Sequence, residues 1–283
     1  MVYFILGLFW GSFLNNVAYR LAKGEKFLFD RSKCPYCKKI LRWYELIPIL
    51  SFLIQKGRCR NCKEKISLRY PITELITGLF TYGIAKKSWL LYFYSIENFI
   101  LFIYLLFLYS LVFILALYDL DTFYISEEIY YFGIFVWIIF TIIFLFLKFP
   151  EINLFGGVNY LITLPSKSQA SKFYLILDQL FNAFLFSLLF LIIFLVSLGK
   201  GLGLGDVKIA FLLGLFLKLG DLISIFLLAS LIGSILGIYN IFFKKRFFKE
   251  VPLIPFLFFG LFVALFYGDY IYKLVFKIML KLS

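Results

Sequence analysis

Two aspartates at the ends of apolar segments are the residues whose type and position best suit them to chemistry. Asp119 closes one such segment in residues 117–121 (LYDLD), and Asp206 opens another in residues 201–208 (GLGLGDVK), 87 positions later. Two carboxylates that meet in a partly dry cleft do not both ionise: one keeps its proton while the other acts as a base on water. Such a pair hydrolyses a peptide bond without a metal. Taken singly, each aspartate is also explained as an interfacial cap that faces headgroups or a helix N-terminus.

Histidine is absent from the 283 residues. A Ser-His-Asp triad, a Cys-His pair and a His-Glu-x-x-His zinc site are therefore all excluded. Proton transfer is left to carboxylates, lysines, tyrosines and the four cysteines. This exclusion, together with the GLGD context of Asp206, favours the catalytic interpretation of the two aspartates over the capping one.

Glycines precede the second aspartate at every other position. Gly201, Gly203 and Gly205 are predicted to adopt backbone angles, and to permit close approaches, that a side chain would forbid. We expect this stretch to let an extended substrate segment lie beside Asp206, with Gly203, Gly205 and Lys208 assigned to substrate or backbone positioning.

Four cysteines form two CxxC pairs that 21 residues separate. Two such knuckles supply four thiolates that close a tetrahedron around zinc. The predicted ligands are Cys34, Cys37, Cys59 and Cys62. A site closed by four thiolates leaves no open coordination position, so the zinc is predicted to be structural. Disulfides or metal-free thiols are the alternative, and a cytoplasmic position would disfavour stable disulfides.

The rest of the chain is apolar enough to require a membrane. Hydrophobic residues make up 63% of the sequence, aromatic residues 22%, and the mean hydropathy is +0.95. Eight apolar segments of membrane-spanning character predict an all-α polytopic membrane protein with about eight transmembrane helices. These segments are residues 2–21, 71–85, 96–118, 127–147, 173–198, 207–219, 222–243 and 253–276.

Charge divides the sequence into a first transmembrane helix (1–21), a polar loop domain (22–70) and a transmembrane domain (71–283). Residues 20–70 hold fourteen Lys and Arg against four acidic residues, which places the cysteine loop on the cytoplasmic side. Counting helices from there puts both aspartates on the same side. The net charge of +13 is assigned to topology and to anionic lipid headgroups, not to nucleic acid.

Several segments resemble the type IV prepilin leader peptidases. Residues 11–21 (GSFLNNVAYRL) are similar to the opening signature of that family, and residues 66–75 (ISLRYPITEL) follow the cysteine knuckles in the family manner. The segments of Asp119 and Asp206 correspond to its two catalytic motifs, and residues 254–256 (IPF) resemble its C-terminal element. Two departures stand out: Ser126-Glu127 occupies the place of the usual Pro-Asp pair, and Leu257 follows the IPF element.

The resemblance implies an aspartic endopeptidase of the bacterial inner membrane. Its substrates would be type IV prepilins or pseudopilins, cleaved at the cytoplasmic face by Asp119 and Asp206. Many members with the cysteine loop also N-methylate the new N-terminus with S-adenosylmethionine, which here is implied by resemblance alone. Asp121 is assigned no chemical role, because it points to another side of the helix that carries Asp119.

Other functions remain open at this point. A presenilin-like protease also combines a Tyr-Asp segment with a GxGD motif, although it leaves the cysteine loop unexplained. A transporter would use membrane-embedded carboxylates as an ion path. The residues available for such a path are Asp119, Asp206, Glu74, Glu97 and Asp178. A non-enzymatic zinc-bearing scaffold would depend on neither aspartate.

Overall fold

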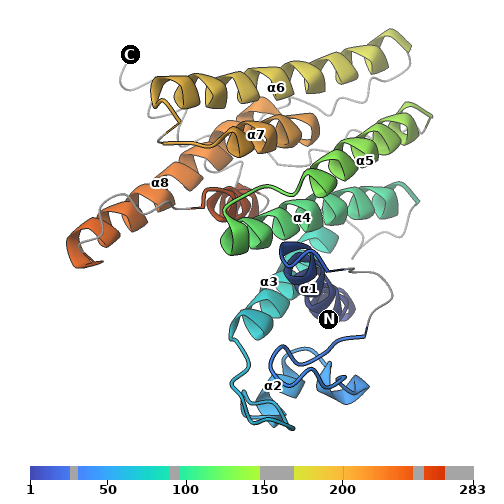
Figure 1. Cartoon of the computed structure of the whole chain (residues 1–283). Coiled ribbons are helices and arrows are strands. Elements are labelled where there is room, and N and C mark those ends of the chain that lie inside the picture. The colour runs from blue at the N-terminus through green and yellow to red at the C-terminus, as the bar shows by residue number, and fades with distance from the viewer. Residues whose placement is uncertain (26–30, 89–95, 147–168, 200, 245–251, 265–283) are drawn as a thin grey trace. The chain divides into compact units, whose positions relative to one another are not determined.

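The computed structural model is all-helical over the residues that it describes, and it confirms the predicted fold class (Figure 1). These residues are 1–25, 31–88, 96–146, 169–199, 201–244 and 252–264. Pairing between extended segments within them is limited to two isolated bridges, both in the cysteine loop. The chain forms two compact units, Met1–Asp121 and Thr122–Ser283.

Each of the eight predicted apolar segments coincides with a helix. These are α1 (Val2–Ala22), α3 (Arg69–Lys87), α4 (Ile96–Thr122), α5 (Glu127–Phe146), α6 (Gln169–Val196), α7 (Leu204–Phe216), α8 (Leu219–Lys244) and the helix Ile254–Ala264. Among the residues that the structure describes, four helices, α1, α4, α6 and α8, are long and apolar enough to cross a membrane. Eight crossings therefore stay a prediction, and the last segment beyond residue 264 lies outside the described residues.

In the first unit, α1 and α3 approach closely because small residues line their contact. A Cβ on Gly11 would lie 1.8 Å from Oγ1 of Thr77, and one on Gly7 would lie 2.7 Å from the same threonine's carbonyl oxygen. Glycines spaced four apart permit this backbone approach in membrane helices. Helix α4 packs on both partners, since Trp10 of α1 donates its Nε1–H to Ser110 Oγ at 2.7 Å and Phe80 of α3 stacks on Tyr109.

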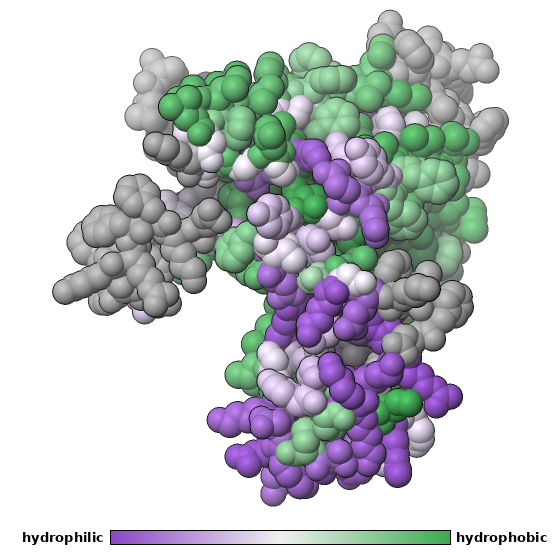
Figure 2. Space-filling model, in the orientation of Figure 1, coloured by the Kyte–Doolittle hydropathy of each residue, from purple (hydrophilic) through white to green (hydrophobic). Residues whose placement is uncertain are grey.

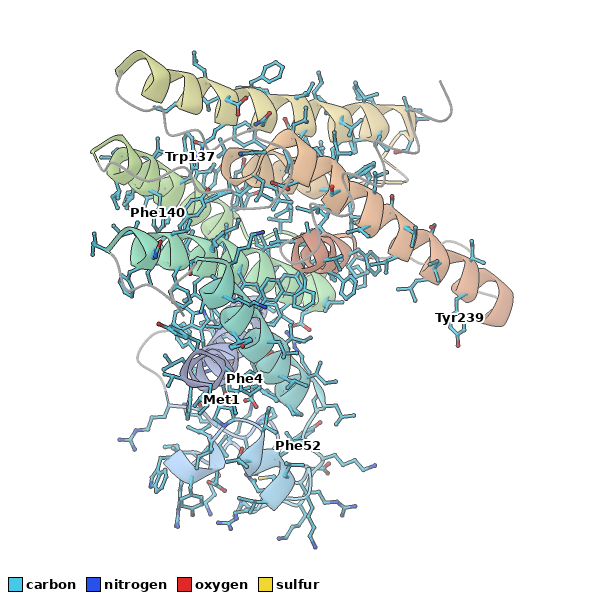
Figure 3. The ribbon with its side chains drawn as sticks, turned by 180° about the vertical axis from the view of Figure 1, so that it is seen from behind. Met1, Phe4, Phe52, Trp137, Phe140 and Tyr239 are labelled. Carbon is cyan, nitrogen blue, oxygen red and sulfur yellow. The ribbon has the colours of Figure 1, made fainter. Side chains whose placement is uncertain are left out.

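The second unit is built on a similarly close contact between α6 and α7. A Cβ on Gly214 would lie 2.3 Å from Cα of Ala183. Helix α5, which carries Trp137 (Figure 3), is bonded to α6 where the indole Nε1–H donates to Gln179 Oε1 at 3.2 Å. The helix Ile254–Ala264 lies against α8, because a Cβ on Gly260 would lie 2.7 Å from the carbonyl oxygen of Ile225.

The cysteine loop has little regular structure. It contains a 3-10 turn, η1 (Trp43–Glu45), and a short helix, α2 (Leu50–Ile54). The surface of the loop is mostly hydrophilic, whereas the helices expose apolar side chains (Figure 2). The carboxylate of Glu74 on α3 accepts the backbone N–H of Ile49 at 2.7 Å, which fastens the loop to its helix. This buried acid of the proposed ion path therefore has a structural partner.

Candidate active site

Asp119 lies in the last turn of α4 and is 7% exposed. The last four carbonyls of a helix have no intrahelical partner, so this turn opens more readily than the rest of α4. The turn carries a second acid, Asp121, and contains no basic residue. The negative end of the helix dipole disfavours both carboxylates, so the turn needs a cation from elsewhere.

Asp206 lies in the first turn of α7, and its carboxylate caps that helix. Oδ2 accepts the backbone N–H of Gly203, the N-cap residue, at 2.9 Å. This bond satisfies one of the amides that a helix N-terminus leaves unpaired. Burial raises the pKa of the Asp206 carboxyl, and the Gly203 N–H opposes that rise. A raised pKa suits a carboxyl that holds a proton near neutral pH.

The glycines before Asp206 only partly behave as the sequence predicts. Gly203 has φ −90° and ψ 160°, extended angles that any residue adopts, and in this loop the positive φ falls on Gly199. The predicted close approach is found at Gly205, where a Cβ would lie 2.8 Å from Cδ1 of Ile125. The neighbour at this position is the protein's own loop before α5, so the glycine is needed for packing within the protein.

Lys208 forms an ion pair with Glu127, the first residue of α5. Both side chains are largely exposed, at 40% and 54%. The pair joins the first turns of α5 and α7, and it lies one turn of helix beyond the contact between Ile125 and Gly205. The positioning role of Lys208 stays a prediction. Its partner Glu127 entered the sequence analysis only as a departure from the family pattern.

The four cysteines come together as their spacing predicts. All are free thiols, and their sulfur atoms lie within 4.8 Å of one another. The Sγ atoms of Cys34 and Cys62 are 3.9 Å apart, close to the edge of about 3.8 Å in a tetrahedron with Zn–S bonds of about 2.3 Å. Hydrogen bonds, the largest from the Asn61 side chain, lower the pKa of Cys37 to about 6. At Cys62 a backbone hydrogen bond at Glu64 lowers the pKa, but burial and the other three thiols outweigh it and raise the pKa to about 11.

Asp121, to which the sequence analysis assigns no chemical role, has an ion-pair partner in the structure. Both of its carboxylate oxygens accept from Nη1 of Arg69, at 2.6 and 2.7 Å. Arg69 is the first residue of α3, and its Nε–H donates to Oδ1 of Asn15 on α1 at 3.0 Å. No spacing rule connects positions 15, 69 and 121, but each lies in a segment that carries the family resemblance.

The apolar helices and the cysteine cluster define the class of this chain as a helical membrane protein with a candidate metal site. Two family models match the chain, the Bacterial Peptidase A24 N-terminal domain over residues 5–88 and the Type IV leader peptidase family over residues 106–238. The chain belongs to the type IV leader peptidase family. The first match contains the cysteines and Arg69, and the second contains both aspartates.

Curated relatives carry the name prepilin leader peptidase/N-methyltransferase. The protein of Bacillus subtilis is 28% identical over 282 residues, which cover 99% of this chain and 98% of the relative. That of Aeromonas hydrophila is 29% identical and covers 94% of this chain and 90% of the relative. That of Myxococcus xanthus is 46% identical over 84 residues, 30% of this chain and 25% of the relative. No solved structure gives a significant match.

Proposed function

We propose that this chain is an aspartic endopeptidase that removes the leader peptide from type IV prepilins or pseudopilins. Family membership and the names of full-length relatives support the reaction class. The chemistry is assigned to Asp119 and Asp206, because the chain has no histidine and its cysteines are gathered in one cluster. Prepilin processing explains the cysteine loop and the opening signature, which the presenilin-like alternative leaves unexplained.

The observation that best supports the pairing is the course of the chain after Asp119. The chain leaves α4 at Thr122, and three residues later Ile125 packs on Gly205, immediately before Asp206. Two residues further, Glu127 is paired with Lys208, two positions after Asp206. The segment that follows the first aspartate is thus held at the turn that carries the second. A pair formed across this connection is the arrangement that we propose.

In the proposed reaction the two carboxyls share one proton. The ionised carboxylate takes a proton from water, whose oxygen bonds to the scissile carbonyl carbon, while the protonated carboxyl gives its proton to the carbonyl oxygen. The intermediate collapses when the carboxyl that took the water proton gives it to the peptide nitrogen. The C–N bond then breaks, the new N-terminal amine leaves, and a hydroxyl of the intermediate returns its proton to the other carboxylate as the new carboxyl group forms. The pair then again holds one proton. Burial raises the pKa of the Asp206 carboxyl, which is the direction that favours a retained proton.

We assign the cysteine cluster to a structural zinc ion held by Cys34, Cys37, Cys59 and Cys62. The number, type and separation of the sulfur atoms fit tetrahedral thiolate coordination. When bound, the metal would staple a loop that has little apolar core of its own. We further propose that the loop and both aspartates face the cytoplasm of a bacterial inner membrane, where basic loops are retained.

N-methylation of the new amine is a second activity that we carry over from the names of the relatives. It requires S-adenosylmethionine as methyl donor. Incubation of purified protein with a cleaved pilin and labelled S-adenosylmethionine should transfer label to the pilin N-terminus. Transfer that is undetectable while cleavage is robust would confine this chain to the peptidase reaction.

The decisive experiment is cleavage of a prepilin by purified wild-type protein, Asp119→Asn and Asp206→Asn in detergent. Asparagine keeps the shape of aspartate but neither binds nor releases the proton. Each variant should be inactive while eluting as folded protein. Glu128→Gln, which removes an exposed acid from the first turn of α5, is the matched control and should cleave normally. Near wild-type cleavage by a correctly inserted Asp206→Asn would refute the aspartic mechanism.

A further inference from the structure

Three side chains from three helices form a hydrogen-bonded clamp at the end of α4. We use "Arg69 clamp" for Asn15, Arg69 and Asp121. Arg69 donates to Asn15 at 3.0 Å and to both oxygens of Asp121 at 2.6 and 2.7 Å. Asn15 is 1% exposed, whereas the side chains of Arg69 and Asp121 are 26% and 28% exposed. The clamp therefore has a buried residue on α1, Asn15, at one end and the partly exposed ion pair of Arg69 and Asp121 at the other.

The clamp places a positive charge beside the last turn of α4, which carries two acidic residues. Two carboxylates at a helix C-terminus are disfavoured by the dipole, and the turn has no basic residue of its own. The guanidinium of Arg69 supplies the missing positive charge from α3. An arginine held at two of its nitrogens is also a fixed group, since its planar fork loses little freedom on binding.

Asp119 and Asp121 lie in the same turn of α4, so an attachment at Asp121 also restricts Asp119. Residues two apart are separated by about 200° around the helix axis, so Asp121 and Asp119 point to nearly opposite sides. Holding Asp121 against α3 therefore fixes the rotation of the turn and the direction in which Asp119 points. Without it, the turn that bears Asp119 is the part of α4 most prone to fray.

We infer that the Arg69 clamp positions the Asp119 carboxylate for catalysis, so that Asp121 and Arg69 are positioning residues of the peptidase. The inference rests on the proposed function. It adds a positioning role to Asp121, to which the sequence analysis assigns no chemical role. It also gives one physical reason why residues 11–21, 66–75 and 117–121 all carry the family pattern: they meet in this clamp.

The test is prepilin cleavage by Asp121→Ala, Arg69→Gln, Arg69→Lys and the double variant Asp121→Ala/Arg69→Gln. A displacement of about 1 Å of a reacting group costs on the order of 100-fold. We expect kcat to fall about 10- to 100-fold in Asp121→Ala and Arg69→Gln. KM should be unchanged, because a positioning role gives neither side chain a contact with substrate. The double variant should be no slower than the worse single one, since both break the same unit. Arg69→Lys, which keeps the charge, should recover part of the loss.

Controls separate positioning from folding and from the proposed function itself. Lys86→Gln removes an exposed basic residue from the other end of α3 and should leave kcat unchanged. If any clamp variant is recovered in poor yield, Asn15→Ala is measured instead. It removes the hydrogen bond that Arg69 donates to Asn15, and the same loss in kcat is expected. Hydrogen exchange at residues 117–122 should accelerate in each slow variant while α1 and α3 keep their protection.

Three outcomes would overturn the inference. These are wild-type kcat in Asp121→Ala, a loss carried by KM, or an additive double variant. The series includes Asp119→Asn. If that variant still cleaves, the proposed aspartic mechanism has failed. If it is inactive while Asp121→Ala is normal, the mechanism stands and the positioning role alone has failed.

Discussion

The two turns that carry the aspartates solve opposite electrostatic problems. Asp206 begins a helix, where the dipole favours an acid, and its carboxylate caps its own turn through the Gly203 amide. Asp119 ends a helix, where the dipole disfavours an acid, and its turn is stabilised by a guanidinium from another helix. In each turn the charged residue two positions after the aspartate makes the ion pair, Asp121 in one and Lys208 in the other.

The two ion pairs differ in how much their helices depend on them. The side chains of Arg69 and Asp121 are 26% and 28% exposed, whereas those of Lys208 and Glu127 are 40% and 54% exposed. Arg69 also donates a hydrogen bond to the buried Asn15. Exposed ion pairs contribute about 0–1 kcal/mol, and less at high salt. A self-capped turn therefore needs its ion pair less than a turn at the wrong end of the dipole.

The largest effect is expected when either catalytic carboxyl is removed. Asp119→Asn and Asp206→Asn should each lower kcat by at least about 1,000-fold, and the double variant should be no worse than either. Single-turnover cleavage of a prepilin measures this. Multiplying losses in the double variant would show that the two turns act independently, which would contradict a shared proton.

The next effect concerns packing at the second turn. Gly205→Ala places a methyl group 2.8 Å from Cδ1 of Ile125, so the loop or the turn must move, and kcat should fall about 10- to 100-fold. Gly203→Ala is the matched control, because the nearest atoms to its Cβ are 3.8 Å away and its backbone N–H is retained. Adding Ile125→Ala to Gly205→Ala should restore activity. Equal losses in the two glycine variants would instead implicate the loop's general flexibility.

A smaller effect should follow from breaking the exposed ion pair. Lys208→Gln and Glu127→Gln are each expected to lower kcat by less than about 5-fold, because the Asp206 turn keeps its cap. Arg69→Gln should therefore have a lower kcat than Lys208→Gln when these two variants are measured under the same conditions. Added salt screens the Lys208–Glu127 pair in the wild-type protein. The difference in kcat between wild type and Lys208→Gln should therefore not grow as salt is added. A Lys208→Gln loss as large as that of Arg69→Gln would remove the asymmetry between the turns.

The smallest effect on cleavage is expected at the cysteine cluster. Cys34→Ser should lower the zinc content of purified protein well below the expected one ion per chain, and should expose the loop to protease. Cleavage should persist, because the reacting groups lie elsewhere in the chain. Elemental analysis, limited proteolysis and cleavage are measured on the same sample. Metal-free wild-type protein, freshly isolated and reduced, would refute the zinc assignment.

Much of this protein was predictable from residue types and spacing. The apolar segments correspond to helices because any backbone placed in lipid must satisfy its own hydrogen bonds, and a run of apolar residues reports that requirement directly. The cysteine cluster followed from two CxxC knuckles, since each knuckle fixes the separation of its own pair of sulfurs. The catalytic role of Asp119 and Asp206 is still a prediction, founded on local motifs and on the absence of histidine.

The partners of the charged residues were decided only by tertiary structure. The sequence alone determined that Asp121, Arg69, Lys208 and Glu127 carry charge near the ends of helices. It did not determine that Arg69 lies against Asp121, 52 positions away, or that Glu127 faces Lys208, 81 positions away. Helical periodicity specifies which side of a helix a residue occupies, but which helix meets that side depends on packing. At Gly205, likewise, the glycine was visible in the sequence, and only the fold showed that Ile125 lies against it.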